Sequence, residues 1–317
     1  MANFEEMQAK LKGAKVIVTG GTGFIGSHLV ERLVGMEAHV RVLTKTGNVE
    51  NLKDVLPKIE LRRCDLTKGA EVKNALEGTE YVFHLAAAIP KRGTRYDHPV
   101  DAINANILAT VNLCDAILSN GDFKKLVTAS TTEVYGIPRR TPITEQHPTN
   151  PLTFYGASKL ASEKFINVYA RRYSLDAVIL RYSVVFGPRE GAYERAIPNF
   201  IRNILNKESP KIYGSGNQIR NYIYVDDVVE YTLRAISETP STVYNAGAIN
   251  IPIGDLARKL ISVTKCELEP EYVTADAGEY DFTLDTSKIE GELKYQPNTL
   301  IEVGLSKEIQ WYLNKGI

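Results

Sequence analysis

The chain has 317 residues, of which 44% are hydrophobic and 24% charged, a composition ordinary for a globular protein. Its length predicts two lobes or one large α/β domain. Its 38 Lys and Arg balance its 38 Asp and Glu, so no basic surplus favours a nucleic-acid partner. The best apolar stretch, residues 81–89, is much shorter than the roughly 20 residues that cross a membrane, so we expect no membrane partner either.

The N-terminal residues and the cysteines predict a cytoplasmic protein. Residues 1–7 carry early acids and no long apolar core, unlike a secretory signal. Cys64, Cys114 and Cys266 are scattered and form no CxxC pair, which favours reduced thiols over disulfides or zinc ligands. The five histidines show no ligand spacing, so we expect no metal.

Short apolar runs alternate with segments of helical periodicity through the first half of the chain. Strands are predicted at residues 16–18, 40–43, 60–64, 81–85, 125–129 and 177–181. Helices are predicted at residues 26–33, 103–118 and 155–173. This alternation predicts an α/β fold with a Rossmann-like, doubly wound parallel sheet that is covered on both faces.

The pattern changes after Gly187, where prolines and a Gly214-Ser-Gly216 turn separate short helices from isolated strands. We interpret residues 183–317 as mainly a smaller C-terminal lobe, which is interleaved with the domain of residues 1–182. A later segment, about residues 221–248, is expected to return to that first domain.

A glycine-rich turn, Thr19-Gly-Gly-Thr-Gly-Phe-Ile-Gly26, joins the first predicted strand to the first predicted helix. Gly20, Gly23 and Gly26 follow a variant of the dinucleotide fingerprint, in which glycines permit a tight turn, close approach of a pyrophosphate and helix packing on the sheet. The free N–H groups at the start of the helix favour an anion. The first domain is therefore predicted to bind a dinucleotide, and the C-terminal lobe mainly the substrate.

The end of the second predicted strand leaves the choice between NAD and NADP open. An acid about 20 residues after the glycines commonly binds the ribose of NAD. Thr44 and Lys45 stand at about that distance here. A hydroxyl and an ammonium would accept the 2′-phosphate of NADP, which a carboxylate repels; alternatively, Lys45 is a solvated surface lysine. Asp65, after the third strand, is expected to accept a hydrogen bond from the adenine amino group.

Tyr155 and Lys159 form a Tyr-x-x-x-Lys pair on one face of a predicted helix. A cation beside a phenol favours its phenolate, so Tyr155 is predicted to take a proton from a substrate carbinol near neutral pH. A chance pair on the helix surface is the alternative, which the upstream glycine fingerprint disfavours.

The fifth predicted strand runs into Ser130-Thr-Thr-Glu-Val-Tyr-Gly136. Ligands in open α/β sheets bind beyond the carboxyl ends of strands, where Thr131, Thr132 and Glu133 would lie. A hydroxyl there would share the substrate oxygen with Tyr155; the alternative is a simple strand-end turn.

Together these motifs resemble the extended short-chain dehydrogenase/reductase superfamily, and within it the nucleotide-sugar epimerase/dehydratase branch. The motifs that carry the resemblance extend over nearly the whole chain: residues 19–26, 65–66, 84–87, 130–136, 155–159, 180–189, 212–220, 224–227, 245 and 285–288.

The resemblance implies a role for each matching residue. Tyr155 is the implied general base, Lys159 holds the nicotinamide ribose, and Thr131 bonds the reacting oxygen. Arg220 would pair with the substrate diphosphate, although an ordinary surface arginine is the alternative. The cofactor-binding residues are then predicted as Gly20, Gly23, Phe24, Ile25, Gly26, Thr44, Lys45, Asp65, Leu66, Leu85, Ala86, Ala87, Tyr155 and Lys159. The substrate-binding residues are predicted as Thr132, Ser183, Asn199 and Arg220.

Several reactions belong to this branch. Related dehydratases often carry Asp-Glu where this chain has Thr132-Glu133, which disfavours a dehydratase; Glu133 is either catalytic or a cap of the turn. A 4-epimerase needs only the Thr/Tyr/Lys set. An NDP-hexose 4-epimerase similar to UDP-glucose 4-epimerase, working through a 4-keto intermediate on a retained NAD, is therefore predicted. The alternative is an NADPH-dependent NDP-4-keto-6-deoxyhexose reductase, followed by a dehydratase, a decarboxylase or a non-catalytic cofactor-binding regulator.

Two residues depart from the pattern of the branch. Val184 replaces a common Asn, and Asn221 replaces an Asp that often follows the arginine, so the exact sugar nucleotide stays open. The resemblance also implies a homodimer that pairs the helices predicted at residues 103–118 and 155–173; alternatively, both helices only cover the sheet.

Overall fold

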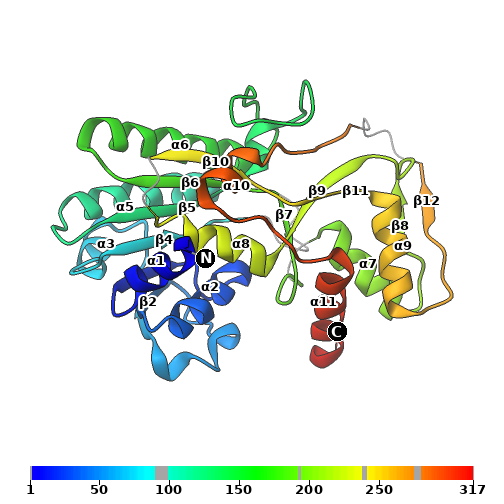
Figure 1. The fold of residues 1–317 in the computed structure, drawn as a ribbon, viewed down its shortest axis with the longest axis horizontal. Coiled ribbons are helices and arrows are strands. Elements are labelled where there is room, and N and C mark those ends of the chain that lie inside the picture. The colour runs from blue at the N-terminus through cyan, green and yellow to red at the C-terminus, as the bar shows by residue number, and fades with distance from the viewer. Residues whose placement is uncertain (1, 90–98, 192–193, 238–240, 275–279, 317) are drawn as a thin grey trace.

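A computed structural model describes residues 2–89, 99–191, 194–237, 241–274 and 280–316 (Figure 1). Its centre is a seven-stranded sheet of order β10-β6-β5-β4-β1-β2-β3, in which every neighbouring pair is parallel. The strands are β1 (Lys15–Thr19), β2 (His39–Thr44), β3 (Glu60–Arg63), β4 (Tyr81–His84), β5 (Lys125–Thr131), β6 (Ala177–Tyr182) and β10 (Thr242–Ala246).

The six strands predicted from the sequence are present, and β10 adds a seventh at the edge beside β6. In the centre, Val18 of β1 lies between Val42 of β2 and Phe83 of β4. The order of the strands reverses between β1 and β4, and open α/β sheets bind ligands at such a reversal, beyond the carboxyl ends of the strands. The predicted Rossmann-like architecture is confirmed.

Helices cover both faces of the sheet because successive strand residues point to opposite sides. Val16 and Val18 belong to the apolar core with α2 (Phe24–Gly35) and α8 (Val225–Arg234), and α1 (Ala2–Leu11) packs against α8. Ile17, between them, belongs to a second core with α3 (Gly69–Ala75), α5 (Ala109–Leu118) and α6 (Phe154–Tyr173).

The segment predicted as one helix over residues 103–118 is irregular. It begins as α4 (Pro99–Ala102), continues as a wider π-helical segment (Ile103–Leu108) and becomes α5. The N–H of Ala109 bonds the carbonyl of Asn104, five residues back. The carbonyl of Asn106 accepts from Thr110 Oγ1 at 2.6 Å and Ser162 Oγ at 3.0 Å, so side chains contribute to the hydrogen bonding of this irregular segment.

The rest of the chain builds a second lobe, on the right in Figure 1. It holds a sheet of order β11-β9-β7 and a second sheet of β12 and β8. Its strands are β7 (Val184–Phe186), β8 (Lys211–Tyr213), β9 (Ile219–Tyr224), β11 (Ile249–Pro252) and β12 (Glu271–Val273), and its helices include α7 (Ala196–Leu205), α9 (Ile253–Thr264) and α11 (Ile301–Lys315).

Short 3₁₀ segments lie at Glu50–Leu52, Leu56–Lys58 and Thr132–Tyr135, and α10 (Ser287–Leu293) packs beside β10.

Between residues 221 and 248 the chain changes lobes. β9 belongs to the three-stranded sheet of the second lobe, whereas α8 packs on α2 and β10 joins the seven-stranded sheet. The proposed domain boundaries at residues 182 and 183 stay a prediction. Within the described residues, no helix combines the length and the apolar character that crossing a membrane requires.

Candidate active site

A cavity of about 380 Å³ opens beyond the carboxyl ends of the central strands. Every residue predicted to bind the cofactor lines it, together with Thr131 and Ser183. Thr132, Glu133, Asn199 and Arg220 do not line this cavity. Because of the strand order, one end of the cavity lies beside β2 and β3. The opposite end lies beside β5 and β6 and holds Tyr155 and Lys159.

The glycine turn forms the floor between these two ends. Gly20 has φ +71°, and a Cβ there would lie 2.6 Å from the backbone nitrogen of Ala86. A Cβ on Gly26 would lie 2.2 Å from the carbonyl oxygen of Gly20. Helix α2 begins directly after Gly23, without a side-chain cap or an acid in its first turn. The first-turn amides therefore remain available to an anion, and this cradle fits the pyrophosphate of a nicotinamide dinucleotide.

At the β2 and β3 end, Lys45 and Asp65 form an ion pair. Lys45 Nζ lies 2.9 Å from Asp65 Oδ2, and Thr67 donates to Oδ1 from both its backbone N–H and its hydroxyl. The hydrogen bond from Lys45, followed by those from Thr67, lowers the pKa of Asp65 to about 2. Asp65 is therefore ionised throughout the neutral range.

At the other end, Tyr155 and Lys159 stand on the first turns of α6. Thr153 caps this helix, because its hydroxyl accepts from the N–H of Gly156 at 2.9 Å. The cap fixes the first turn of the helix, and the side chains of Tyr155 and Lys159 are buried and line the cavity. Burial lowers the pKa of Lys159 to about 8, and the charge of Glu163 partly opposes that shift. Thr131 lies at the end of β5, in the same part of the cavity.

This combination of a glycine cradle and a buried Tyr/Lys pair agrees with the comparison to known families. Residues 16–247 match the profile of the NAD dependent epimerase/dehydratase family. The chain belongs to this family. Its membership confirms the resemblance drawn from the motifs, and the cofactor class is a nicotinamide dinucleotide, NAD or NADP.

Similar proteins of this family include several 4-epimerases. The UDP-glucose 4-epimerase of Mycolicibacterium smegmatis is 31% identical over 95% of this chain and 99% of its own length. The structure of UDP-N-acetylglucosamine 4-epimerase from Methanobrevibacter ruminantium, with UDP-N-acetylmuramic acid, matches with TM-score 0.88 and 31% identity over 96% of this chain and 99% of that one. UDP-glucuronic acid 4-epimerase from Bacillus cereus, solved with UDP-glucuronic acid and NAD, matches with TM-score 0.86 and 26% identity over 95% and 99%.

Dehydratases of the family are also similar. The dTDP-glucose 4,6-dehydratase of Mycolicibacterium smegmatis is 30% identical over 94% of this chain and 93% of its own length.

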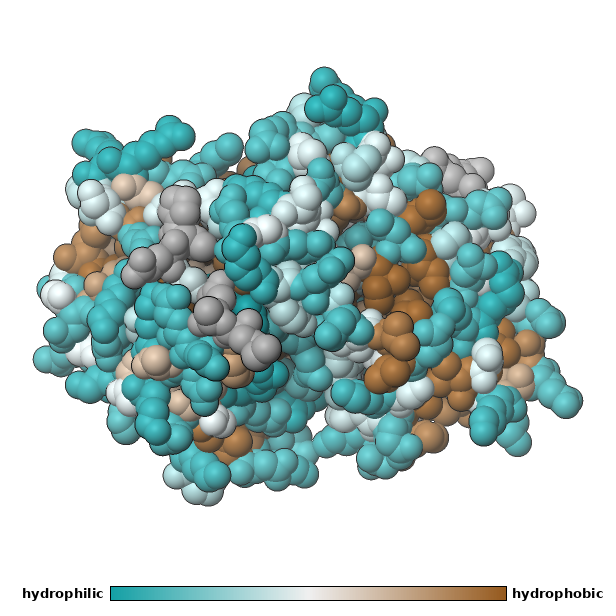
Figure 2. Space-filling model, viewed as in Figure 1, coloured by the Kyte–Doolittle hydropathy of each residue, from teal (hydrophilic) through white to brown (hydrophobic). Residues whose placement is uncertain are grey.

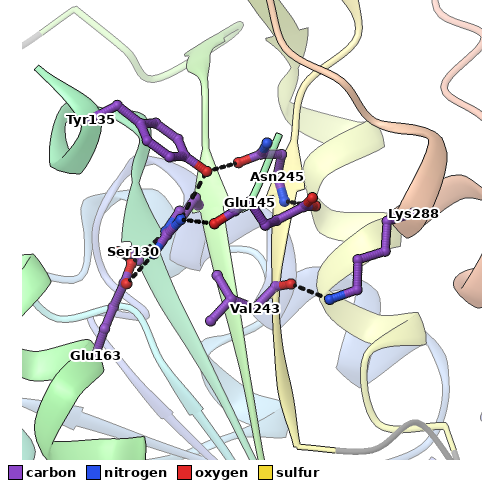
Figure 3. A network of polar contacts seen from close by, with 8 residues as sticks. Ser130, Tyr135, Glu145, Glu163, Val243, Asn245 and Lys288 are labelled. Atoms are coloured by element: carbon purple, nitrogen blue, oxygen red, sulfur yellow. Dashed lines mark hydrogen bonds and ion pairs between the residues drawn. The ribbon is translucent and has the colours of Figure 1, made fainter. Parts of the chain in front are cut away.

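A buried polar network holds the Tyr/Lys end of this epimerase/dehydratase site (Figure 3). Arg181 of β6 donates to both carboxylate oxygens of Glu163 on α6, at 2.7 and 3.0 Å, and Ser130 Oγ donates to the same carboxylate. Arg181 also donates to the hydroxyl of Tyr135, which in turn donates to Asn245 Oδ1 at 2.6 Å. The network ties α6 to β5, β6 and β10, so the helix with Tyr155 has a fixed position on the sheet.

Sequence reasoning missed Asn106, which connects the π-helical segment to α6. Its Nδ2 donates to Ser158 Oγ at 2.8 Å, and its Oδ1 accepts from the N–H of Ala88. The side chain is fully buried. A polar residue at an inward position of an apolar helix is the only sequence signal, and it does not say which groups Asn106 meets.

His84, within the predicted motif of residues 84–87, is a second structural polar group. Its Nδ1 lies 2.7 Å from Thr19 Oγ1 and its Nε2 3.1 Å from Thr110 Oγ1. Burial and then the charge of Lys159 lower the pKa of His84 to about 3, so the ring is neutral. Thr110 uses its own hydrogen on the carbonyl of Asn106, so His84 Nε2 is the donor in that pair.

The remaining predicted residues lie outside the cavity. Arg220 donates to the carbonyls of Ile219 and Tyr280, and its guanidinium stacks 4.7 Å from the Tyr280 ring. Asn199 is exposed on α7 and accepts from Arg202. Their substrate contacts stay predictions, as does that of the buried Thr132. Arg195, which was not predicted, lines the cavity from the second lobe.

Proposed function

We propose that the protein is an NDP-hexose 4-epimerase that interconverts the two C4 configurations of a sugar nucleotide such as UDP-glucose. The observation that carries the proposal is the placement of Tyr155, Lys159 and Thr131 around one end of the cavity that holds the glycine cradle. The 4-epimerases among the similar proteins support the same reaction class.

The chain supplies proton transfer and positioning for this reaction. Lys159 stabilises the phenolate of Tyr155, and the phenolate oxygen takes the proton of the C4 hydroxyl to become a neutral phenol. Thr131 Oγ1 accepts the N–H of Glu133, so its own hydrogen is available to the C4 oxygen. A bound nicotinamide dinucleotide supplies the acceptor and donor of the C4 hydride. The 4-keto sugar then rotates so that its other face receives the hydride, and Tyr155 returns the proton to the C4 oxygen, which gives the opposite configuration at C4.

Glu133 is proposed to position the helix rather than to transfer protons. Its Oε2 accepts from Thr153 Oγ1 at 2.8 Å, and Thr153 is the cap of the helix with Tyr155. We expect Glu133→Gln to keep this hydrogen bond and most of the epimerase activity, whereas a catalytic role predicts near-complete loss.

The reductase stays the second candidate, because Thr44 and Lys45 both line the cavity. The two functions differ in stoichiometry. A 4-keto-6-deoxyhexose reductase consumes one NADPH per turnover, whereas an epimerase regenerates its dinucleotide and turns over without an added reductant.

The proposal is tested by incubating the purified protein with UDP-glucose and measuring UDP-galactose. Tyr155→Phe removes the phenolic proton carrier, and we expect the turnover to fall below detection. Tyr173→Phe is the matched control, because Tyr173 is exposed at the far end of α6 and outside the cavity. Equal activity of the two variants would refute the role of Tyr155.

We also propose a homodimer formed through the face that residues 103–118 share with α6. Ile103, Leu108, Phe165 and Val168 are exposed there, with 38 to 52% of each residue accessible. A second copy would cover these apolar side chains. We expect Phe165→Glu to yield monomers in light scattering, and a wild-type protein that is monomeric at micromolar concentration would contradict the proposal.

Exposed apolar side chains also lie elsewhere. Figure 2 shows brown residues gathered in the half of the molecule that carries α7, α9 and α11, where Leu300, Val303 and Leu313 are exposed.

A cytoplasmic location is proposed as well, and the free state of Cys64, Cys114 and Cys266 supports it.

A further inference from the structure

The β2 and β3 end of the cavity is lined by residues that bear on the choice of dinucleotide. Leu43, Thr44, Lys45 and Thr46 line it from the end of β2, and residues 64–67 line it from the end of β3. Both segments lie beside the glycine turn. In a dinucleotide laid across this cradle, the adenosine ribose reaches this end.

The end of β2 offers hydrogen-bond donors and no carboxylate. Residues 44–49 read Thr-Lys-Thr-Gly-Asn-Val. Thr44 Oγ1 accepts from the N–H of Gly47 at 3.2 Å, so the Thr44 hydroxyl hydrogen remains for another acceptor. Thr46 is exposed beside it. A ribose 2′-hydroxyl finds no acid here, whereas a 2′-phosphate finds an ammonium and two hydroxyls.

Asp65 does not replace the missing acid. Its Oδ1 already accepts two hydrogen bonds from Thr67, and its Oδ2 faces Lys45. The Lys45 side chain is 69% exposed, and an ion pair so open to water adds little to stability because solvent screens it. Lys45 can therefore leave Asp65 for a phosphate of nearly two negative charges, or contact both groups at once, at little cost.

We propose that this protein binds NADP in preference to NAD, with Lys45 and the hydroxyls of Thr44 and Thr46 as the 2′-phosphate site. This preference rests on the proposed function only in that the cavity is the dinucleotide site of the epimerase. The residues that set it line the cofactor cradle, and the sugar plays no part in it.

The test compares the binding of 2′,5′-ADP with that of 5′-AMP by calorimetry. These probes differ only in the 2′-phosphate and contain no nicotinamide, so the readout is independent of turnover. We expect 2′,5′-ADP to bind at least about tenfold more tightly at low salt, with the ratio shrinking as salt screens the charges. Equal binding of both probes, or tighter binding of 5′-AMP, would overturn the proposal.

Two variants locate the effect. Lys45→Met is expected to weaken the binding of 2′,5′-ADP about tenfold and to leave the binding of 5′-AMP unchanged. Thr44→Asp is expected to make 5′-AMP the tighter of the two probes. Lys53→Met is the matched control, because Lys53 is exposed and does not line the cavity. Equal losses in Lys45→Met and Lys53→Met would refute a specific site.

The result is separable from the epimerase proposal. A protein that prefers 2′,5′-ADP but does not interconvert UDP-glucose and UDP-galactose keeps the 2′-phosphate site and loses the proposed reaction. A protein that interconverts them but prefers 5′-AMP keeps the reaction and loses the site.

Discussion

The side-chain amide of Asn106 donates to Ser158 Oγ across 2.8 Å and so joins the π-helical segment after β4 to the helix that carries Tyr155 and Lys159. The backbone carbonyl of Asn106 accepts from Ser162, one turn further along the same helix. Asn106 contacts α6 at two levels, and this defines it as a positioning residue for the Tyr/Lys pair.

Replacing Asn106 by alanine is expected to lower kcat by roughly 10- to 100-fold, because small misplacements of catalytic groups carry large rate costs. KM and the affinity for the dinucleotide should change little. Steady-state kinetics measure kcat and KM, and a cofactor titration measures the affinity for the dinucleotide. Asn203→Ala is the control, since Asn203 makes a comparable bond, to the carbonyl of Ser209, away from the cavity. A purely structural role of Asn106 would lower stability without this split between kcat and KM.

The neutral state of His84 predicts a loss of stability in acid. Its pKa is about 3 in the folded protein, against 6.5 for an unperturbed ring, so the unfolded chain binds the extra proton between these values. Stability therefore falls as the pH drops below about 6.5, by roughly 3 kcal/mol at pH 4.

Denaturant titrations from pH 7 to pH 4 test this prediction. The free energy of unfolding should fall less steeply with decreasing pH in His84→Gln, whose new side chain does not titrate. In His39→Gln, where the replaced side chain is exposed, it should fall as steeply as in the parent protein. An identical slope in His84→Gln and the parent protein would show that His84 does not carry the effect.

The buried pair of Arg181 and Glu163 predicts a large cost for breaking it. Both residues are buried, so Arg181→Met leaves an unpaired carboxylate and should lower the free energy of unfolding by about 3–5 kcal/mol. Removing both charges in Arg181→Met/Glu163→Leu should cost less than Arg181→Met alone.

Arg258→Met provides the comparison. Arg258 pairs with Asp255 at 2.6 Å, but both side chains are about half exposed, so the loss should stay below about 1 kcal/mol. Equal losses at the two pairs in urea unfolding would contradict the account of the network.

Much of the first lobe could be predicted from the sequence because its signals are local. The strands are short apolar runs, and the glycines lie within one turn, so their contacts follow from their spacing. The surroundings of Tyr155 and Lys159 could not be predicted in this way. Arg181 meets Glu163, and Tyr135 meets Asn245, only after β6, α6 and β10 have assembled.

The second lobe was less predictable for the same reason. β9 lies between β11 and β7, and Arg220 meets Tyr280, a residue far along the chain. Neither pairing leaves a periodic pattern. The residues predicted there from family motifs, Asn199 and Arg220, were found outside the cavity, whereas Arg195 was found within its wall.

Two buried acids of that lobe predict the opposite pH dependence to His84. Glu190 and Glu308 are fully buried, and none of their carboxylate oxygens has a hydrogen-bond partner among the described residues. Burial first, and for Glu308 also the charge of Glu190, raises the pKa of both groups above the ordinary 4.5. Their contribution to stability is complete below pH 4.5 and is lost as the pH rises.

Glu190→Gln removes one of these ionisations. Its melting temperature should match the parent near pH 5 and exceed it near pH 8. Glu208→Gln, an exposed residue of the same lobe, should show no such difference. Lower stability of Glu190→Gln at both pH values would mean that the carboxyl is needed in its charged form.

The most direct test of an internal hydride transfer uses UDP-glucose labelled with deuterium at C4. The protein as purified is incubated with this substrate without added dinucleotide, and the product is analysed by mass spectrometry and NMR. We expect UDP-galactose that keeps the deuterium at C4, because the hydride leaves and returns within one active site. Product that has lost the label to solvent, or turnover that requires added NADPH, would contradict the account.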